Sequence, residues 1–310
     1  MTEPLLSPRE VARAIGVSES TLKRWADSGA IATTRTPGGH RRIPFAEAVA
    51  LIRRSGVPLR HPALLGLPEL AADVAAPGAP PAGEHLYELL TQDDGAQARG
   101  FLISLYVAGW TIPAIFDGPM CAALTRIGEL WRHDAQGIFL EHRATQTCLQ
   151  ALLQLRGLLP ASVERAPLAL GAAPAGDPYF IPSQMAALVT ADAGFRECNL
   201  GPETPFEVLK RAVVERRPRL VWVAMSVSPS EPRAVATDLL ALAKVVEDQG
   251  GVVALGGRGA SALGALAAGL QRLGSMGELA ALGRGLLART APHASAAMRN
   301  VGDGPRGSRR

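Results

Sequence analysis

The sequence of 310 residues predicts an α/β multidomain protein with a winged helix-turn-helix head, a four-helix bundle and a flavodoxin-like, doubly wound parallel sheet domain. Three observations lead to this prediction. Positive charge and two short capped helices lie within residues 1–57, apolar residues recur at helical spacing over residues 84–160, and strand and helix patterns alternate over residues 166–290. One hydrophobic core rarely serves a chain of this length, so several domains are expected.

Charge and composition limit the class of protein. Residues 1–60 hold ten Lys/Arg and five Asp/Glu and so carry +5, whereas the whole chain carries +4 and the remainder therefore −1. The basic segment is where a polyanion would bind, although charge alone fits a solvated surface equally well. The three cysteines do not have the spacing of a metal site or of a disulfide framework. The sequence shows no export signal and no run of roughly 18 apolar residues, so we expect a cytoplasmic protein without a membrane partner.

The first two predicted helices form a helix-turn-helix. Ser7-Pro8-Arg9-Glu10 has the pattern of a capping box, and Gly16 is placed to end the helix that it opens. Ser18 can cap a second helix, which runs to Ser28. In this geometry the second helix lays its early residues against base edges in the major groove. The outward-facing polar residues predicted to contact DNA are Ser20, Thr21, Lys23 and Arg24.

A basic hairpin is predicted to follow the two helices. Residues 31–35 and 40–43 have the pattern of two strands joined at Pro37-Gly38-Gly39, and a further helix opens at Pro44 and ends near Gly56. A basic hairpin beside a helix-turn-helix is a wing, which suits contact with the phosphate backbone. The predicted wing contacts are Arg35, His40, Arg41 and Arg42.

The segment SPREVARAIGVSESTLKRWADSGAI, followed by TPGGHRRI, resembles the DNA-binding domain of MerR-family regulators over about 50 residues. The resemblance implies a dimer-forming regulator that binds an inverted-repeat operator in double-stranded DNA. It also implies which side chains touch that DNA: Thr21, Lys23, Arg24, His40, Arg41 and Arg42.

The middle of the chain predicts a linker and a bundle. Residues 58–83 are rich in Pro, Ala and Gly and predict a semi-rigid spacer, residues 84–160 predict about four helices, and residues 291–310 predict a disordered basic tail. In the bundle, Trp131 precedes Glu141-His142 by ten positions, and such a group near helix ends could cap a flat ligand. Composition alone favours a plainer interpretation, a buried aromatic ring with a surface ion pair.

The C-terminal part predicts a sheet with helices on both faces, because strand candidates alternate with helices. The strands are expected at residues 167–172, 194–200, 219–225 and 251–256. A ligand of such a fold binds beyond the carboxyl ends of the strands, where Asp177, Ser226 and Gly256-Gly257 are found. Glycines there would let a ligand approach the backbone closely, although turn chemistry explains each residue separately.

A bundle followed by this sheet domain, behind a MerR-like head, resembles the CarH/LitR-type cobalamin-dependent photoreceptor regulators over almost the whole chain. Trp131-x9-Glu141-His142 matches the motif that covers the upper face of the cofactor, and Ser226 and Gly256-Gly257 match later elements of the cobalamin domain. The resemblance implies a repressor that assembles as a tetramer on DNA in the dark with adenosylcobalamin, and that falls apart when light cleaves the cobalt–carbon bond.

The sequence departs from that pattern at the first loop of the sheet domain. Where the family has Asp/Glu-x-His-x-x-Gly, this chain has Asp177-Pro178-Tyr179-Phe180-Ile181-Pro182, so Tyr179 replaces the lower-face histidine. Neutral imidazole is a good cobalt ligand, whereas a phenol with a pKa of about 10 is a poor one. Pro182 replaces the glycine that makes room for the nucleotide tail, and it adds a ring and removes an amide hydrogen.

Three interpretations of the sensor follow. The pocket could hold a different flat tetrapyrrole, a biliverdin-type bilin or haem, with Trp131, Tyr179 and Phe180 lining it and His142 or His133 serving a ring nitrogen or an iron. Cobalamin could still bind with its own base or water below the cobalt. The module could also have lost its ligand and serve dimerisation or partner binding.

An enzyme is the alternative from another class. The bundle and sheet also resemble the corrinoid-carrier modules of methyltransferases. No Ser-His-Asp set, acid pair or phosphate loop is visible in the sequence, and the DNA-binding head argues for a regulator. The chain is therefore predicted not to be an enzyme.

Overall fold

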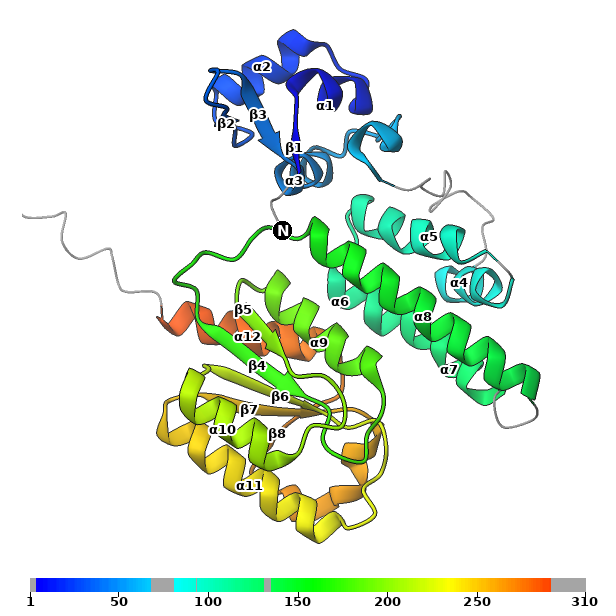
Figure 1. Cartoon of the computed structure of the whole chain (residues 1–310), viewed down its shortest axis with the longest axis vertical. Helices are drawn as coiled ribbons and strands as arrows, with labels where there is room; N and C mark the ends of the chain where they lie inside the picture. Colours follow the sequence, from blue (N-terminus) through cyan, green and yellow to red (C-terminus); the bar gives the residue numbers. More distant parts are fainter. Residues whose placement is uncertain (1–3, 68–80, 93, 131–134, 291–310) are drawn as a thin grey trace, which may run out of the picture.

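The computed structural model describes residues 4–67, 81–92, 94–130 and 135–290. It has three parts, which Figure 1 shows with the head at one end, the helical bundle beside it and the sheet domain at the other end. The fold is α/β: a helix-turn-helix region is followed by helices and by a parallel five-stranded sheet with helices on both faces, as the sequence predicts.

Local signals account for the head. Ser7 and Glu10 form both hydrogen bonds of a capping box, and Gly16 ends the first helix in the left-handed conformation, with φ of 71°. A strand that the sequence did not predict, Leu5–Leu6, adds to the hairpin and gives an antiparallel sheet of order β1-β3-β2. The elements are β1 (Leu5–Leu6), α1 (Pro8–Ile15), α2 (Glu19–Asp27), β2 (Thr34–Arg35), β3 (Arg41–Pro44) and α3 (Phe45–Ser55).

The prediction that a linker begins at residue 58 is wrong for residues 58–67, which pack against the head. The amides of Arg60 and His61 both donate to the carbonyl oxygen of Ala14, at 2.8 and 3.0 Å, near the end of α1. The 3-10 helix η1 (Pro62–Leu65) then buries Leu65 against the head core. This segment pairs polar groups of α1 and covers apolar surface, which a free spacer would not do. Of the rest of the predicted linker, residues 68–80 lie outside the described residues, as does the predicted tail. The end of the predicted linker is also wrong, because Ala82 and Gly83 already belong to helix α4 (Ala82–Thr91).

The bundle is built from helices that share one apolar interior. Its longest helix, α8, packs against α5 and α7, and α4 also packs against α7. Gly118-Pro119 lies in a π-helical turn, η2, so that α6, η2 and α7 follow one another without a loop. The elements are α4 (Ala82–Thr91), α5 (Gly95–Val107), α6 (Ile112–Ile115), η2 (Phe116–Met120), α7 (Cys121–Leu130) and α8 (Ala135–Leu158).

The sheet domain has five parallel strands in the order β5-β4-β6-β7-β8, which is the doubly wound arrangement. The strands are β4 (Leu168–Ala172), β5 (Arg196–Asn199), β6 (Leu220–Ala224), β7 (Val252–Gly256) and β8 (Gln271–Leu273). The four predicted strands are confirmed. The fifth, β8, was not predicted.

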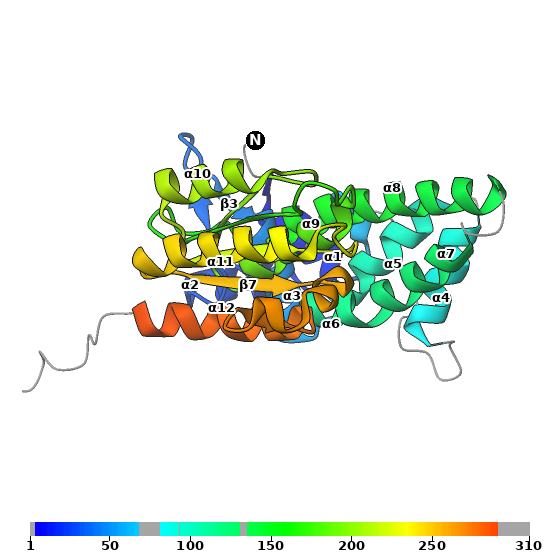
Figure 2. The ribbon, with the colours of Figure 1, turned by 90° about the horizontal axis from the view of Figure 1, so that it is seen from below.

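Two hydrophobic cores lie on opposite faces of this sheet (Figure 1). Helices α9 (Phe180–Asp192) and α12 (Met276–Thr290) cover the face whose core is continuous with that of the bundle. Helices α10 (Phe206–Arg216) and α11 (Pro232–Asp248), with η3 (Arg258–Ala267), cover the other face, and Figure 2 shows α11 in front of β7 on that side. No helix of the described residues is both long enough and apolar enough to cross a membrane.

Two polar links tie the bundle to the sheet domain. The Asp117 carboxylate of η2 accepts hydrogen bonds from the backbone amides of Met276 and Gly277, at 2.8 and 2.9 Å, at the beginning of α12. Arg156 of α8 makes a two-point ion pair with Glu197 of β5, at 2.7 and 3.0 Å. Both carboxylates hold elements far apart in the sequence, so neither link could be predicted from local patterns.

Candidate functional site

Helix α2 presents the strongest candidate DNA contacts. Lys23 and Arg24 are exposed and form no ion pair within the described part of the chain. The hydroxyls of Ser20 and Thr21 instead bind the capping hydroxyl of Ser18, at 2.8 and 2.9 Å. The two cations are therefore free to meet a polyanion, whereas the two hydroxyls already help to shape the beginning of the helix.

The wing presents a second set of candidates. Arg35 and His40 are exposed on either side of its turn, which Thr36 closes through a 2.9 Å hydrogen bond from its amide to the carbonyl of His40. Arg41 is half-buried, and its guanidinium binds the Asp27 carboxylate of α2 at 2.8 Å. That ion pair, which no local sequence pattern indicates, joins the wing to the helix.

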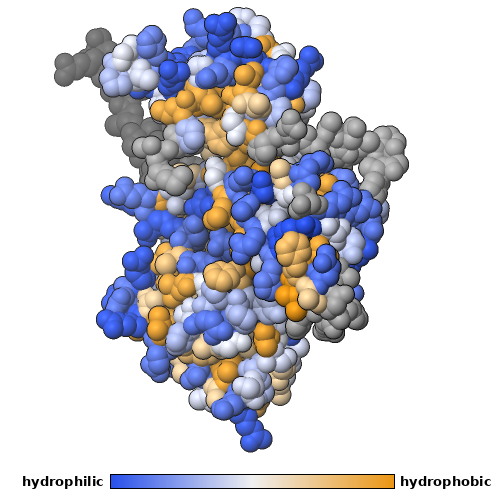
Figure 3. Space-filling model, turned by 45° about the vertical axis from the view of Figure 1, so that its right-hand side comes forward, coloured by the Kyte–Doolittle hydropathy of each residue, from blue (hydrophilic) through white to orange (hydrophobic). Residues whose placement is uncertain are grey.

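Arg42 lies on the same strand and faces the capping box of α1. Hydrogen bonds from Ser7 lower the pKa of Glu10, and attraction to Arg42 adds a smaller effect in the same direction. Figure 3 shows hydrophilic side chains over the far end of the head and apolar ones on the side nearer the rest of the molecule. The charged end is therefore the one open to a large partner.

Asp177 does not face a ligand at the carboxyl edge of the sheet. Its side chain is buried, with one carboxylate oxygen accepting from the backbone amides of Ser226 and of Val227, the latter at 3.2 Å. The other oxygen accepts from the amide of Tyr179 at 3.2 Å. The carboxylate thus ties the loop after β4 to the loop after β6.

The glycines after β7 are explained by the same loop–loop packing. A Cβ on Gly257, whose φ is +99°, would lie 2.1 Å from the carbonyl oxygen of Met225, and one on Gly259 would lie 2.1 Å from that of Val227. A Cβ on Gly256 would lie 3.6 Å from the carbonyl oxygen of Leu273, which is an ordinary contact. Gly257 and Gly259 therefore serve the fold whether or not a ligand approaches.

One buried polar atom at this edge lacks a hydrogen-bond partner in the described part of the chain. The hydroxyl oxygen of Ser226 is buried, and it has no hydrogen-bond partner among the described residues. Buried hydroxyls are usually paired, so an unpaired one beside a ligand-binding edge marks a place where an additional group would be stabilised.

Aromatic side chains project from the same edge. Tyr179 precedes the first turn of α9 and is 43% exposed, while Phe180 opens that turn and is 55% exposed. Pro182 sits within the first turn, where the missing amide costs no helical hydrogen bond. Tyr179 and Phe180 therefore form an apolar rim on which a flat molecule could rest.

The bundle residues of the predicted ligand cap are described only in part. The Nδ1 atom of His142 lies 2.7 Å from one carboxylate oxygen of Glu141. The other oxygen of Glu141 accepts a hydrogen bond from the Thr145 hydroxyl at 3.0 Å. The His142 side chain is 75% exposed on α8. Trp131 and His133 lie outside the described residues, so the cap as a whole stays a prediction.

A metal site is not assembled within the described residues, where no three His, Cys, Asp or Glu side chains come together. Burial raises the pKa of Cys148 to about 12, so this thiol stays protonated near neutral pH. His142 remains a single candidate ligand, open to solvent.

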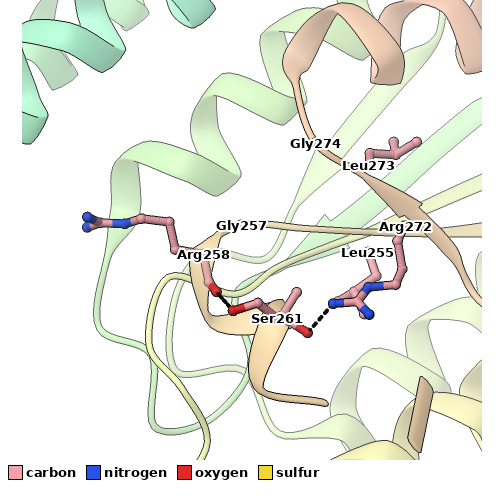
Figure 4. A pocket seen from close by; sticks show the side chains of 8 residues that line it. Leu255, Gly257, Arg258, Ser261, Arg272, Leu273 and Gly274 are labelled. Atoms are coloured by element: carbon pink, nitrogen blue, oxygen red, sulfur yellow. Dashed lines mark hydrogen bonds between the residues drawn. The ribbon is translucent and has the colours of Figure 1, made fainter. Parts of the chain in front are cut away.

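A cavity of about 450 Å³ lies beside the carboxyl ends of β7 and β8 (Figure 4). Arg272 points into it and donates to the carbonyl oxygen of Ala260 at 2.7 Å, so this cation holds η3 in place. Arg258 also lines the cavity and is exposed, and its side chain extends away from Arg272. The cavity is thus bordered by one arginine that holds η3 and by a second, exposed arginine.

Comparison with known proteins bears on two parts of the chain. Residues 5–55 match the helix-turn-helix domain family. No curated protein matches the chain.

Among solved structures, the chain is similar to the monomethylamine corrinoid protein of Methanosarcina barkeri, with a TM-score of 0.50 and 15% identity over 65% of this chain and 96% of that one. It also aligns with a cobalamin-binding protein from Desulfitobacterium hafniense DCB-2, at a TM-score of 0.34 and 16% identity over 70% and 99% of the two chains. A third alignment is with the methanol:cobalamin methyltransferase complex of Methanosarcina barkeri, at a TM-score of 0.27 and 12% identity over 78% and 81%. The first likeness shows a shared fold.

Proposed function

We propose that the chain is a MerR-type transcription regulator, acting as a repressor, whose head binds an inverted-repeat operator in double-stranded DNA. One observation carries the proposal: residues 5–55 match a helix-turn-helix domain, and exposed Lys23 and Arg24 project from its second helix. A helix-turn-helix domain implies DNA binding, and a basic helix beside a basic wing supplies base and phosphate contacts together.

In the same proposal the C-terminal module senses a flat tetrapyrrole, a biliverdin-type bilin or haem. The exposed rings of Tyr179 and Phe180 support it, because aromatic side chains stack on flat conjugated ligands. His142 or His133 would serve a ring nitrogen or an iron from the bundle side. The unpaired hydroxyl of Ser226 supports a polar group at the same edge.

Cobalamin held by a lower-face histidine does not fit the residues present. Tyr179 stands at the ligand position, and a phenol is a poorer cobalt ligand than the imidazole that it replaces. Asp177, two residues earlier, is already bound to three backbone amides. Cobalamin would have to keep its own base or a water below the cobalt, which makes it the second candidate ligand.

The proposed output is a change in oligomeric state, between dimer and tetramer, driven by the ligand or by light that it absorbs. The number of heads that engage the operator together then changes, and affinity changes with it without any altered base contact. Arg53 supports coupling between sensor and head. It donates from α3 to the carbonyl oxygens of Tyr106 and, at 3.1 Å, Trp110, at the end of α5.

A ligand-free regulator is the alternative that one observation favours. Asp177, Gly257 and Gly259, which a ligand-binding edge would use, are already engaged in contacts between loops. In that case the module would serve dimerisation or partner binding. We propose no catalytic activity, and the corrinoid-carrier role in methyl transfer is the least favoured alternative.

Purification from the native host tests the sensor. A bilin or haem absorption spectrum in the purified protein supports the proposal, a corrin spectrum supports the second ligand, and no visible band supports the ligand-free alternative. Fluorescence anisotropy with duplex DNA, with and without the extracted chromophore, then tests control. Equal affinity for the duplex with and without the chromophore would contradict control by the ligand, but it would not contradict DNA binding.

A further inference from the structure

Trp222 fills the space between the sheet and the first turn of α9. It lies in β6, is only 2% exposed, and is paired in register with Gly171 of β4. A Cβ on Gly171 would lie 2.3 Å from the Trp222 ring. The indole therefore covers the neighbouring strand at a position where only glycine leaves room for it.

A hydrogen-bonded chain fixes the ring in that place. The indole nitrogen donates to the hydroxyl of Ser183 at 3.0 Å, and that hydroxyl donates to the side-chain oxygen of Asn199 at 2.8 Å. Asn199 in turn donates to Gln184 at 3.1 Å and accepts from the amide of Gly201 at 3.0 Å. Ser183 is fully buried. The hydrogen-bonding groups of this chain are thus paired with one another, which makes displacement of the indole costly.

The position of the ring matters for a ligand at the carboxyl edge. Cobalamin differs from simpler tetrapyrroles because a benzimidazole ribonucleotide hangs from one side of its ring. If that side faced the loop at residues 176–182, the base would need space beneath it, between α9 and the sheet. Indole and benzimidazole are fused aromatic bicycles of nearly equal size, so Trp222 would occupy that space itself.

We infer that Trp222 closes the module to a nucleotide tail, so that its ligand is a tetrapyrrole without one, lying wholly on the carboxyl edge. The inference rests on the proposed function in one respect, namely that this edge binds a tetrapyrrole. Trp222 acts as a specificity-determining residue, and Ser183 and Gly171 position it.

A matched pair of corrinoids tests the inference on the full chain. Hydroxocobalamin and diaquacobinamide share the corrin ring, and only the first carries the nucleotide. Absorbance titration is expected to give a Kd for cobinamide at least about tenfold lower than for cobalamin. Equal or tighter binding of cobalamin overturns the inference. Biliverdin and haem, titrated alongside, identify which class of tail-less ring binds best.

A second arm needs no chromophore. The free base 5,6-dimethylbenzimidazole should leave the Tm of the wild-type chain unchanged, because its place is filled. In Trp222→Ala, a base concentration ten times its Kd should raise Tm by about 3 °C. Trp110→Ala, which removes a 38% exposed indole, is the control that should show no rise.

The outcomes separate the inference from the proposed function. A rise in Tm for the wild-type chain, or none for a folded Trp222→Ala variant, overturns the inference whatever tetrapyrrole binds. A different result is that no tetrapyrrole binds while the free base still raises the Tm of Trp222→Ala. That result supports the inference that Trp222 fills the space for the base, and it contradicts the proposal that the module binds a tetrapyrrole. If Trp222→Ala does not fold, Trp222→Leu replaces it, and the wild-type arm still decides.

Discussion

The head and the carboxyl edge of the sheet both carry residues that the sequence singles out, yet their side chains are used differently. On α2, Lys23 and Arg24 project into solvent. At the sheet edge, Asp177 and Gly257 are engaged in contacts between neighbouring loops. A residue in a binding pattern can thus be held by contacts within the fold, and only the side chains without such contacts point to a partner.

The largest expected effect concerns the two adjacent glycines. Gly257→Ala should lower the free energy of unfolding by about 2–5 kcal/mol, because its φ of +99° and the nearby Met225 carbonyl both oppose a side chain. Gly256→Ala, whose Cβ meets nothing closer than 3.6 Å, should change it by less than about 1 kcal/mol. Urea unfolding measures both, and equal losses would remove the structural explanation of Gly257.

The free cations of α2 give the next largest effect. Lys23→Ala with Arg24→Ala should weaken duplex binding about 10- to 100-fold and reduce the salt slope by about 2, because two contacts to DNA are lost. Anisotropy titrations at several salt concentrations measure both quantities. Arg211→Ala with Lys244→Ala removes equal charge from exposed positions of the sheet domain and should leave both unchanged. An unaltered slope in the first variant would contradict the placement of DNA on α2.

The link between bundle and sheet should cost less to break. Asp117→Ala removes the acceptor for two backbone amides at the beginning of α12, so the free energy of unfolding should fall by about 1–2 kcal/mol. Asp238→Ala, an exposed carboxylate of α11, is the control and should change it by no more than about 0.5 kcal/mol. Equal changes in the two variants would show that Asp117 does not hold the parts together.

Replacement of Arg53, which links α3 of the head to the end of α5, should have the smallest effect, a change in the pKa of Asp192. Partial shielding from water raises the pKa of Asp192, while Arg53 and Arg284 lower it. Arg53→Met keeps the aliphatic stem and removes one of these cations, so the pKa of Asp192 should rise further. Arg54→Met, the neighbouring exposed arginine, is the control. Carboxyl NMR shifts against pH report the result, and an unmoved pKa would mean that head and α9 are not electrostatically coupled.

The head could be predicted from the sequence because its determinants are local. Ser7 with Glu10, Gly16 and the Pro-Gly-Gly turn each specify backbone geometry within a few residues. The doubly wound sheet could be predicted because strand and helix patterns alternate along residues 166–290. The strand β8 escaped prediction because it has only three residues, two of them exposed, and so shows no apolar run.

The site could be predicted only in outline, because its contacts join distant residues. Asp177 was expected to face a ligand, but its bonds to Ser226 and Val227 depend on two loops about fifty positions apart meeting at one edge. Trp222 carried no signal at all, since its role follows from the register of β6 beside Gly171. Such register is fixed by the whole sheet and not by the local sequence.

Salt dependence of duplex binding by the full chain is the decisive measurement for the head. Measurable binding is expected at low ionic strength, with the logarithm of the association constant falling linearly as the logarithm of salt concentration rises. The decline should become shallower when Lys23 and Arg24 are replaced. A chain that holds no duplex even at low salt, or whose binding ignores salt, would contradict the claim that the head is a DNA-binding surface.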